Sequence, residues 1–131
     1  MQVAGDVYQT AFSNMQVIKL IGSSLPEQIN IPEPKACFNR RLDYHTACAY
    51  RDRSIYFIGG TGDHGYIQNS VIRYDIASNS FRTAPSLKAK RTNASSCELN
   101  GWIYAVCGTT EGNQELETVE RLDVASNAQQ W

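Results

Sequence analysis

The sequence contains no hydrophobic run long enough to cross a membrane and no excess of charge of either sign. A membrane-spanning helix needs about 20 mostly apolar residues, and the longest candidate, residues 15–21, is interrupted by Gln16 and Lys19. The first ten residues contain Asp6 and no Lys or Arg, unlike a secretory signal peptide. The formal net charge is −1, so no basic surface for nucleic acid is indicated. We therefore expect a cytoplasmic protein that binds neither membrane nor nucleic acid.

Residues suited to a metal or redox centre are also scarce. The cysteines are Cys37, Cys48, Cys97 and Cys107. No pair has C-x-x-C spacing, which excludes a zinc knuckle or a thioredoxin-like motif, and neither histidine has metal-ligand spacing to a cysteine. We expect reduced, buried thiols that pack as small hydrophobes, with no metal and no cofactor.

The sequence does contain an internal repeat. Residues 55–60 (IYFIGG) match residues 103–108 (IYAVCG), and residues 73–79 (RYDIASN) match residues 121–127 (RLDVASN), both at an offset of 48 residues. A period of 20–50 residues is typical of solenoids, propellers and arrays. We call residues 41–88 the first unit and residues 89–131 the second unit.

Each unit is predicted to form four short strands. In the first unit these are residues 46–50, 55–58, 70–75 and a strand that opens at 80–83; in the second they are 94–99, 102–106, 118–123 and a fourth strand that contains Trp131. The second strand of each unit is nearly all β-branched or aromatic, as expected where both faces of a strand are buried. No segment has sustained helical periodicity with caps. The sequence therefore predicts an all-β fold.

The pattern within each unit resembles the kelch repeat. It consists of a double glycine after an apolar strand, about a dozen residues before Arg-Tyr-Asp, and then Ser-Asn-x-aromatic. The resemblance implies that each unit is one blade of four antiparallel strands in a kelch-type β-propeller. The second unit departs from this pattern at two positions. Cys107 stands where the first unit has Gly59. The aromatic residue of the motif is Phe81 in the first unit, whereas in the second unit Trp131 lies two residues beyond the corresponding position.

The wording of the second unit is most similar to the Kelch-like family. Its members usually carry an N-terminal BTB domain and serve cullin-3 ubiquitin ligases. The resemblance implies a protein–protein interaction module, not an enzyme, that recognises substrates for such a ligase and reaches cullin-3 through a BTB domain. An actin-associated or scaffolding kelch protein is the alternative. An enzymatic kelch propeller is the least favoured interpretation, because the chain shows no metal set.

Residues 1–40 do not align at the repeat offset. They are interpreted either as a degenerate partial blade or as a linker. A propeller closes with roughly 4–8 blades, so two clear blades, with or without a degenerate third, give an incomplete ring. We expect a fragment, a truncated product or a protomer that needs other copies to close the ring.

The Kelch-like resemblance also implies a partner-binding surface. In that family, partner peptides contact positions just after the arginine that opens the first strand and just after the double glycine. Arg91 is that arginine in the second unit, and Asp43 stands at its 48-residue offset, so Arg40 or Arg41 is expected to substitute. The positions carried over are Tyr44, His45, Thr61, Asp63, Thr92, Asn93, Thr109 and Glu111. They are neutral or acidic, which favours a neutral or basic partner segment.

Two other motifs are predicted to have no chemical role. Residues 60–65 spell G-x-G-x-x-G but lead into a strand pattern rather than the helix that a dinucleotide site requires; the glycines are predicted to be turn residues with positive φ. The acidic run at Glu111, Glu115, Glu117 and Glu120 is predicted to be a solvated loop that leads into a strand.

Overall fold

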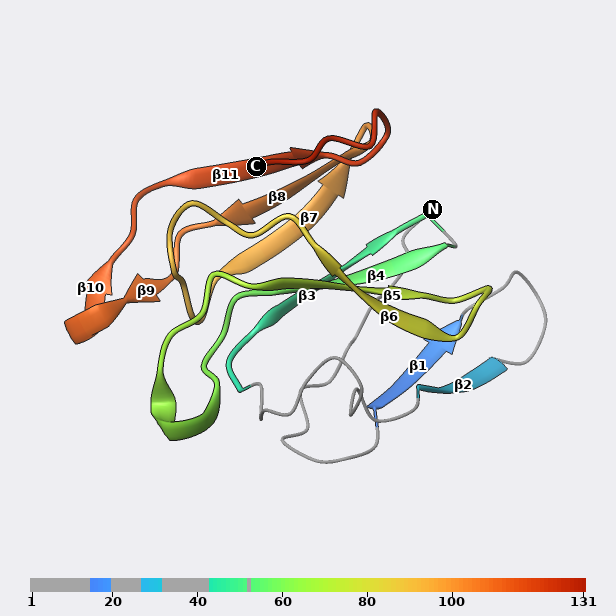
Figure 1. Cartoon of the computed structure of the whole chain (residues 1–131), viewed down its shortest axis with the longest axis horizontal. Coiled ribbons are helices and arrows are strands. Elements are labelled where there is room, and N and C mark those ends of the chain that lie inside the picture. Colours follow the sequence, from blue (N-terminus) through green and yellow to red (C-terminus); the bar gives the residue numbers. More distant parts are fainter. Residues whose placement is uncertain (1–14, 20–26, 32–42, 52) are drawn as a thin grey trace.

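The computed structural model describes residues 15–19, 27–31, 43–51 and 53–131, and these residues form an all-β structure. Each unit folds into one antiparallel sheet, and Figure 1 shows the two sheets next to each other. The first sheet has the order β3-β4-β5-β6 and the second has the order β7-β8-β11. Their strands are β3 (Thr46–Tyr50), β4 (Ser54–Ile58), β5 (Val71–Asp75), β6 (Ser80–Ala84), β7 (Ser95–Leu99), β8 (Trp102–Val106) and β11 (Val119–Asp123). No helix in these described ranges is long and apolar enough to cross a membrane.

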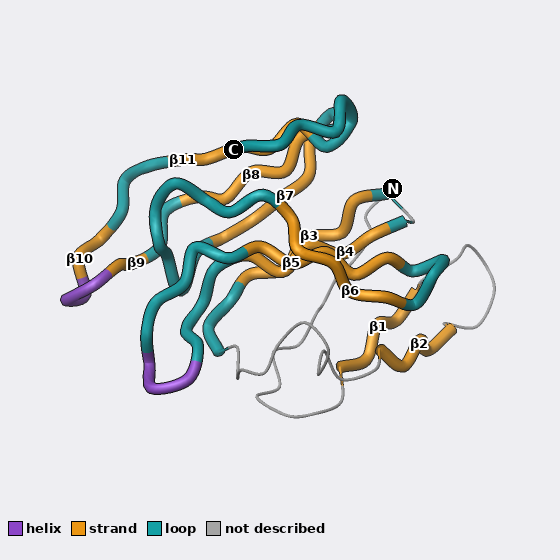
Figure 2. The backbone as a smooth tube through the Cα atoms, in the orientation of Figure 1, coloured by secondary structure: helices purple, strands orange, loops and turns teal. Residues whose placement is uncertain are grey.

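The loop after the second strand of each sheet contains a short 3₁₀ turn. These turns are η1 (Asp63–Gly65) and η2 (Glu111–Asn113), and η2 is flanked by the two-residue strands β9 (Thr109–Thr110) and β10 (Gln114–Glu115). Both turns project from the same end of the sheets and are coloured purple in Figure 2. The loops of the two units therefore share a conformation as well as a length.

The repeat offset is not constant, which corrects the predicted correspondence near the start of the units. β4 and β8 are 48 residues apart, but β3 and β7 are 49 apart. The first hairpin has three loop residues, 51–53, whereas the second has only Asn100 and Gly101, with φ of +53° and +87° as a type I′ turn requires. Tyr44 therefore corresponds to Asn93, and both have φ of +53°. Arg91 corresponds to residue 42 instead of Asp43; residue 42 and the proposed substitutes, Arg40 and Arg41, lie outside the described residues.

An Asp-x-x-Ser turn follows the third strand of each unit. The amide of Ser78 donates to Asp75 Oδ1 at 3.0 Å, and the amide of Ser126 donates to Asp123 Oδ1 at 3.0 Å. Backbone and hydroxyl hydrogen bonds from Ser78 lower the pKa of Asp75, and hydroxyl and backbone bonds from Ser126 lower the pKa of Asp123. Each ionised carboxylate therefore fixes the turn that follows its strand.

The main hydrophobic core lies between the two sheets. Ile103 and Ala105 of β8 are fully buried against side chains of the first sheet such as Ile58 and Val71. The other buried members of this cluster are Cys48, Tyr50, Tyr56, Leu87, Leu122 and Trp131. Apolar side chains that would be exposed on either sheet alone are thus removed from water by the pairing of the sheets.

The late aromatic of the second unit does not take the place of Phe81. Phe81 packs on the other face of the first sheet, with its ring 5.0 Å from that of Tyr74. Trp131 is buried in the core between the sheets, where its indole N–H donates to Pro85 O at 2.5 Å. The predicted fourth strand of the second unit is therefore wrong: residues 124–131 form turns and coil, and β11 is the last strand.

The two second strands also differ in burial. β4 is buried at all five positions, as predicted, but in β8 only Ile103 and Ala105 are buried. Trp102, Tyr104 and Val106 point to the face of the second sheet that no other described element covers. The expectation of burial on both faces was wrong for β8, because burial of that face depends on a neighbouring sheet.

The expectation of buried thiols holds only for one of the three described cysteines. Cys48 is buried in the core between the sheets, whereas Cys97 and Cys107 are exposed. Burial, followed by the nearby Cys97 and Glu98, raises the pKa of the Cys48 thiol to about 12. Cys97 is exposed because it lies on the uncovered face of the second sheet, directly opposite Tyr104.

Alkylation with iodoacetamide at pH 8 is expected to modify Cys97 and Cys107 in the folded protein and Cys48 only after unfolding. The thiolate is the reactive species, and Cys48 keeps its proton because its pKa is about 12. Mass spectrometry before and after urea treatment measures the labelling of each cysteine. Equal labelling rates of Cys48, Cys97 and Cys107 in the folded protein would contradict the prediction.

The raised pKa of Cys48 also affects stability at high pH. A thiol ionises near pH 9 in the unfolded chain, whereas the folded protein favours the neutral thiol up to about pH 12. The free energy of unfolding is therefore expected to fall as the pH rises from about 9 towards 12.

Part of residues 1–40 forms a hairpin of its own. β1 (Met15–Lys19) and β2 (Glu27–Ile31) pair antiparallel, with Val17 opposite Ile29. The remaining residues of this region lie outside the described ranges. The hairpin is compatible with both interpretations, a degenerate partial blade or a linker.

Candidate partner-binding loops

At one end of the two sheets, the segment before each first strand pairs with the loop after the double-glycine position. In the first unit, Asp43 N donates to Thr61 O at 2.9 Å and Thr61 N donates to Asp43 O at 2.7 Å. In the second unit, Thr92 and Thr109 form the same two bonds at 2.9 and 2.8 Å. The two sets of predicted partner-binding positions therefore lie side by side within each unit.

The second glycine of each motif makes this pairing possible. Gly60 and Gly108 have φ of +95° and +94°. A Cβ at Gly60 would lie 2.5 Å from Asp43 O, and a Cβ at Gly108 would lie 2.6 Å from Thr92 O. Either side chain would push the two segments apart, so these glycines are structural residues of the loop surface.

Hydrogen bonds also join the loops of one unit to those of the next. Asn93 N donates to Tyr44 O at 3.0 Å, and Thr92 Oγ1 donates to the same carbonyl at 3.3 Å. Gly60 N donates to Arg91 O at 2.8 Å. The four segments are thus fixed relative to one another before any partner binds.

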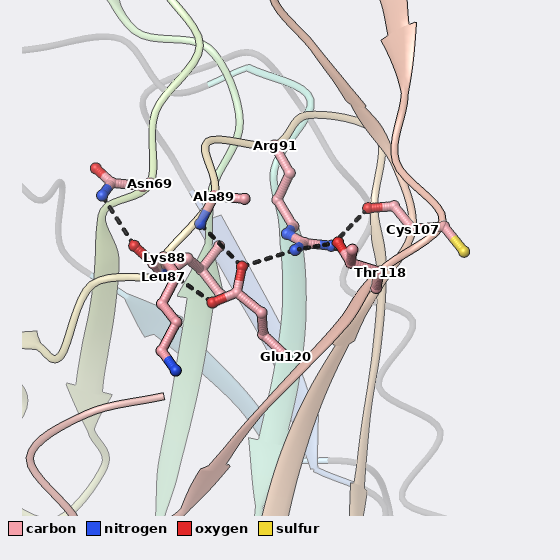
Figure 3. Close-up of polar contacts among 8 residues, drawn as sticks. All are labelled: Asn69, Leu87, Lys88, Ala89, Arg91, Cys107, Thr118 and Glu120. Carbon is pink, nitrogen blue, oxygen red and sulfur yellow. Dashed lines mark hydrogen bonds and ion pairs between the residues drawn. The ribbon is translucent and has the colours of Figure 1, made fainter.

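A buried ion pair supports this end of the second sheet (Figure 3). The side chain of Arg91 is 0% exposed, and its guanidinium lies 2.7 Å from Glu120 Oε1. Arg91 also donates to Cys107 O at 2.8 Å, to Thr118 O at 3.1 Å and to Thr118 Oγ1 at 3.2 Å. The family arginine of the second unit therefore holds the β8–β11 loop from inside and does not face a partner.

Glu120 accepts bonds from the segment that joins the two sheets as well. Lys88 N donates to Glu120 Oε2 at 2.6 Å and Ala89 N donates to Glu120 Oε1 at 3.0 Å. The prediction that the acidic run is a solvated loop holds for Glu111, Glu115 and Glu117, which are exposed, but is wrong for Glu120. The sequence contained one partial signal, because Glu120 lies within a strand pattern, but the burial of Arg91, which requires an anionic partner, is visible only in the structure.

The candidate partner-binding residues differ in what they expose. Tyr44 is 57% exposed, and Asn93 is also exposed next to it. Thr92 is only 6% exposed, which leaves little of it for a partner. The ring of His45 packs edge-on against Phe57 with centroids 5.6 Å apart. The accessible part of the central surface is therefore formed mainly by Tyr44 and Asn93.

The loop tips carry the other candidates. Thr61 and Thr109 are half-buried in the paired segments, Asp63 begins η1, and Glu111 begins η2. Glu111 is exposed and lies 3.6 Å from Lys90 Nζ. Predicted positive φ is confirmed for Gly60 and Gly65, whereas Gly62 has φ of −91°. The loop leads into β5, a strand, as predicted.

The comparisons with known proteins identify the first unit. The kelch motif matches residues 44–88. This segment is a kelch repeat. The chain is 32% identical over 100 residues to the kelch repeat protein M-T9 of Myxoma virus (strain Lausanne), an alignment that covers 70% of this chain and 19% of that protein. It is 31% identical over 98 residues to the F-box/kelch-repeat protein At4g39570 of Arabidopsis thaliana, covering 73% of this chain and 24% of that protein.

A solved structure shows the same fold. The structure of YjhT matches with a TM-score of 0.64 at 13% identity, over 82% of this chain and 34% of that chain. The two sheets are therefore blades of a kelch-type β-propeller, of which the described residues form part of the ring. The first blade has the four predicted strands and the second has three. The chain spans between 19% and 34% of the length of these three proteins.

Replacing Gly59 with Cys, the residue of the second kelch unit, is expected to destabilise the protein by about 1–3 kcal/mol through overpacking. A Cβ at Gly59 would lie 2.3 Å from Arg91 O, where the next blade meets the first. Cys107 has a similar φ, +55° against +64°, and carries a side chain. Urea unfolding of Gly59→Cys and of the matched variant Cys107→Gly measures the difference; an equal effect at both sites would contradict it.

Proposed function

We propose that this chain is the substrate-recognition part of a cullin-3 ubiquitin-ligase adaptor. Kelch repeats are modules for protein–protein interaction, and one relative is named as an F-box/kelch-repeat protein, in which kelch repeats accompany a second domain. The wording of the second unit favours a BTB domain as the partner domain and hence cullin-3. The site of action would be the cytoplasm.

The observation that carries this proposal is the cross-linked loop surface of the two blades. The bond from Asn93 N to Tyr44 O at 3.0 Å joins the units, and the strand-like pairs at Thr61 and Thr109 fix the loops on either side. A surface fixed in advance loses little conformational entropy when a partner binds. Its accessible groups are Tyr44, Asn93 and the acidic loop tip at Glu111, so we propose a neutral or basic substrate segment.

Co-precipitation with cullin-3 tests the ligase part of the proposal. The protein that carries this chain should co-precipitate cullin-3 when its BTB domain is present and lose it when that domain is deleted. Failure to recover cullin-3 would remove the ligase role. Binding at the loop surface is a separate question and is tested by substitutions.

Substitutions on the loop surface test substrate binding. Tyr44→Ala and Asn93→Asp are expected to weaken the binding of a substrate identified through the full protein by at least about tenfold, because central interface residues carry most of the binding energy. Leu99→Ala is the control, since Leu99 is 57% exposed on the uncovered face of the second blade. Equal loss in all three variants would place the binding surface elsewhere.

An actin-associated role is the second candidate. Kelch repeats alone do not separate it from the ligase role. Co-sedimentation with actin filaments, abolished by the same loop substitutions, would favour this candidate over the first.

A further inference from the structure

A polar cavity of about 260 Å³ lies between the two blades at the end opposite the partner-binding loops. Its wall is formed by Tyr50, Arg51, Arg53, Ser54, Arg73, Val124 and Ala125. Residues 51–54 follow the last residue of β3, whereas the partner-binding positions Tyr44 and His45 precede its first residue. The volume is below the range of about 300–1,000 Å³ of sites for drug-sized ligands. The cavity therefore suits a small group.

The charge of this wall is positive. Arg51, Arg53 and Arg73 all line the cavity, although the chain as a whole has a net charge of −1. Asp75 forms an ion pair with Arg73 at 3.1 Å. Among the described residues, the three guanidinium groups are therefore opposed by one carboxylate, and this excess of positive charge attracts an anion.

Arg73 has an unused donor at this site. Its Nη2 donates to Asp75 Oδ2, but its Nε is buried and has no hydrogen-bond partner. The hydroxyl of the buried Tyr56 is close to the Arg73 side chain: burial raises the pKa of that hydroxyl, and the positive charge of Arg73 and a hydrogen bond from it oppose the rise. A buried donor without a partner is uncommon in native proteins, and an anion in the cavity offers it an acceptor.

The second kelch unit provides an internal comparison. At the position of Ser54 it has Trp102, and at the position of Arg73 it has Arg121, whose guanidinium lies 4.3 Å from the Trp102 ring centre. The two hairpins also differ: the arginines of residues 51–53 are replaced by Asn100 and Gly101. Only the first unit therefore has the small Ser54, which leaves the space, and the hairpin arginines Arg51 and Arg53, which add to its positive charge.

We propose that this cavity binds a phosphate-type oxyanion. Guanidinium groups bind phosphate oxygens through paired N–H donors, and the excess of cations favours a dianion over a single carboxylate. Free phosphate and the phosphate of a phosphorylated serine share this chemistry. The site lies at the other end of the blades from the loop surface, so it does not depend on the proposed function.

Titration of the intact chain with sodium phosphate, against sodium chloride at equal ionic strength, tests the site. Amide NMR signals of residues 51–54 and 124–125 are expected to shift in a saturable way with phosphate alone. Arg53→Gln should weaken phosphate binding at least tenfold, and its side chain is exposed, so the fold should be kept. Arg121→Gln removes the same charge from a residue of the second unit that does not line the cavity and should leave the affinity unchanged.

A second variant and a peptide pair complete the test. Ser54→Trp introduces the residue of the second unit and should abolish the shifts by filling the cavity. The peptide pair is a phosphoserine peptide and its unphosphorylated form. If only the phosphorylated peptide binds, and it binds more tightly than free phosphate, the bound phosphate group comes from a phosphorylated protein. If the phosphoserine peptide binds no more tightly than free phosphate, the ligand is the free ion. Equal shifts in chloride, or equal affinities of Arg53→Gln and Arg121→Gln, would overturn the proposal.

Discussion

Glu120→Ala is expected to lower the free energy of unfolding by about 3–5 kcal/mol, because it leaves the buried charge of Arg91 without its partner. The Arg91 side chain is 0% exposed and that of Glu120 is 10% exposed, so water can replace the carboxylate only poorly. The change also removes the acceptor of the Lys88 and Ala89 amides. Small domains have a total stability of about 5–15 kcal/mol, so a large part of the stability would be lost.

Urea unfolding measures this loss of stability. The dependence of the free energy of unfolding on urea concentration should be unchanged, because the substitution should not alter the surface exposed on unfolding. Glu117→Ala is the matched control, because Glu117 belongs to the same acidic run and is exposed; it should change stability by less than about 0.5 kcal/mol. A loss below about 1 kcal/mol for Glu120→Ala would contradict a structural role of the pair.

The first unit suggests a further variant of the same pair. Its sequence has Leu42 and Ile72 at the positions of Arg91 and Glu120, and Ile72 is buried. The double variant Arg91→Leu with Glu120→Ile is expected to be less destabilising than the sum of the two single changes, since no unpaired buried charge remains. A double-mutant cycle gives the coupling energy; simple additivity would show that the two side chains act independently.

Trp131→Ala is expected to destabilise the protein by about 3–5 kcal/mol, the usual cost of removing a buried tryptophan from a core. The indole is 8% exposed, packs in the core between the blades and donates to Pro85 O. Pro85 follows the last strand of the first blade, so Trp131 connects the two blades through both apolar contact and a hydrogen bond.

Trp102→Ala is the control for Trp131→Ala. Trp102 is half-exposed on the uncovered face of the second blade and contacts the guanidinium of Arg121. Loss of an exposed cation–π contact costs about 0.5–1 kcal/mol, so this variant should be clearly more stable than Trp131→Ala in urea unfolding followed by circular dichroism. Similar losses in the two variants would show that Trp131 adds little to the core between the blades.

The two units show how far a repeat in the sequence predicts a structure. The antiparallel strands follow from residues that are close in sequence, and they are confirmed for all four strands of the first unit and the first three of the second. The offset of 48 residues failed for residues 43–50, because one extra residue in the 51–53 hairpin changes the register. That error matched Tyr44 to Thr92, which is buried, and not to Asn93, which is exposed.

Burial depended on contacts that the sequence did not reveal. Tyr56 and Tyr104 occupy the same position of the repeat, yet only Tyr56 is covered by a neighbouring blade. Cys48 and Cys97 likewise correspond to each other at the 49-residue offset, and one is buried while the other is exposed. Alternation along a strand predicts which residues share a face, but the environment of that face depends on the element packed against it.

By itself, the sequence determined that this protein is built from repeated antiparallel blades of the kelch type, because turn glycines, strand propensity and the repeat are local properties of the chain. Only the tertiary structure decided which polar residues are structural and which are accessible. Glu120 belongs to an acidic run that looks solvated, and Arg53 belongs to an ordinary hairpin. Glu120 is buried in its ion pair with Arg91, and Arg53 lines a cavity. Both environments arise where the two blades meet, and the sequence alone does not show this contact.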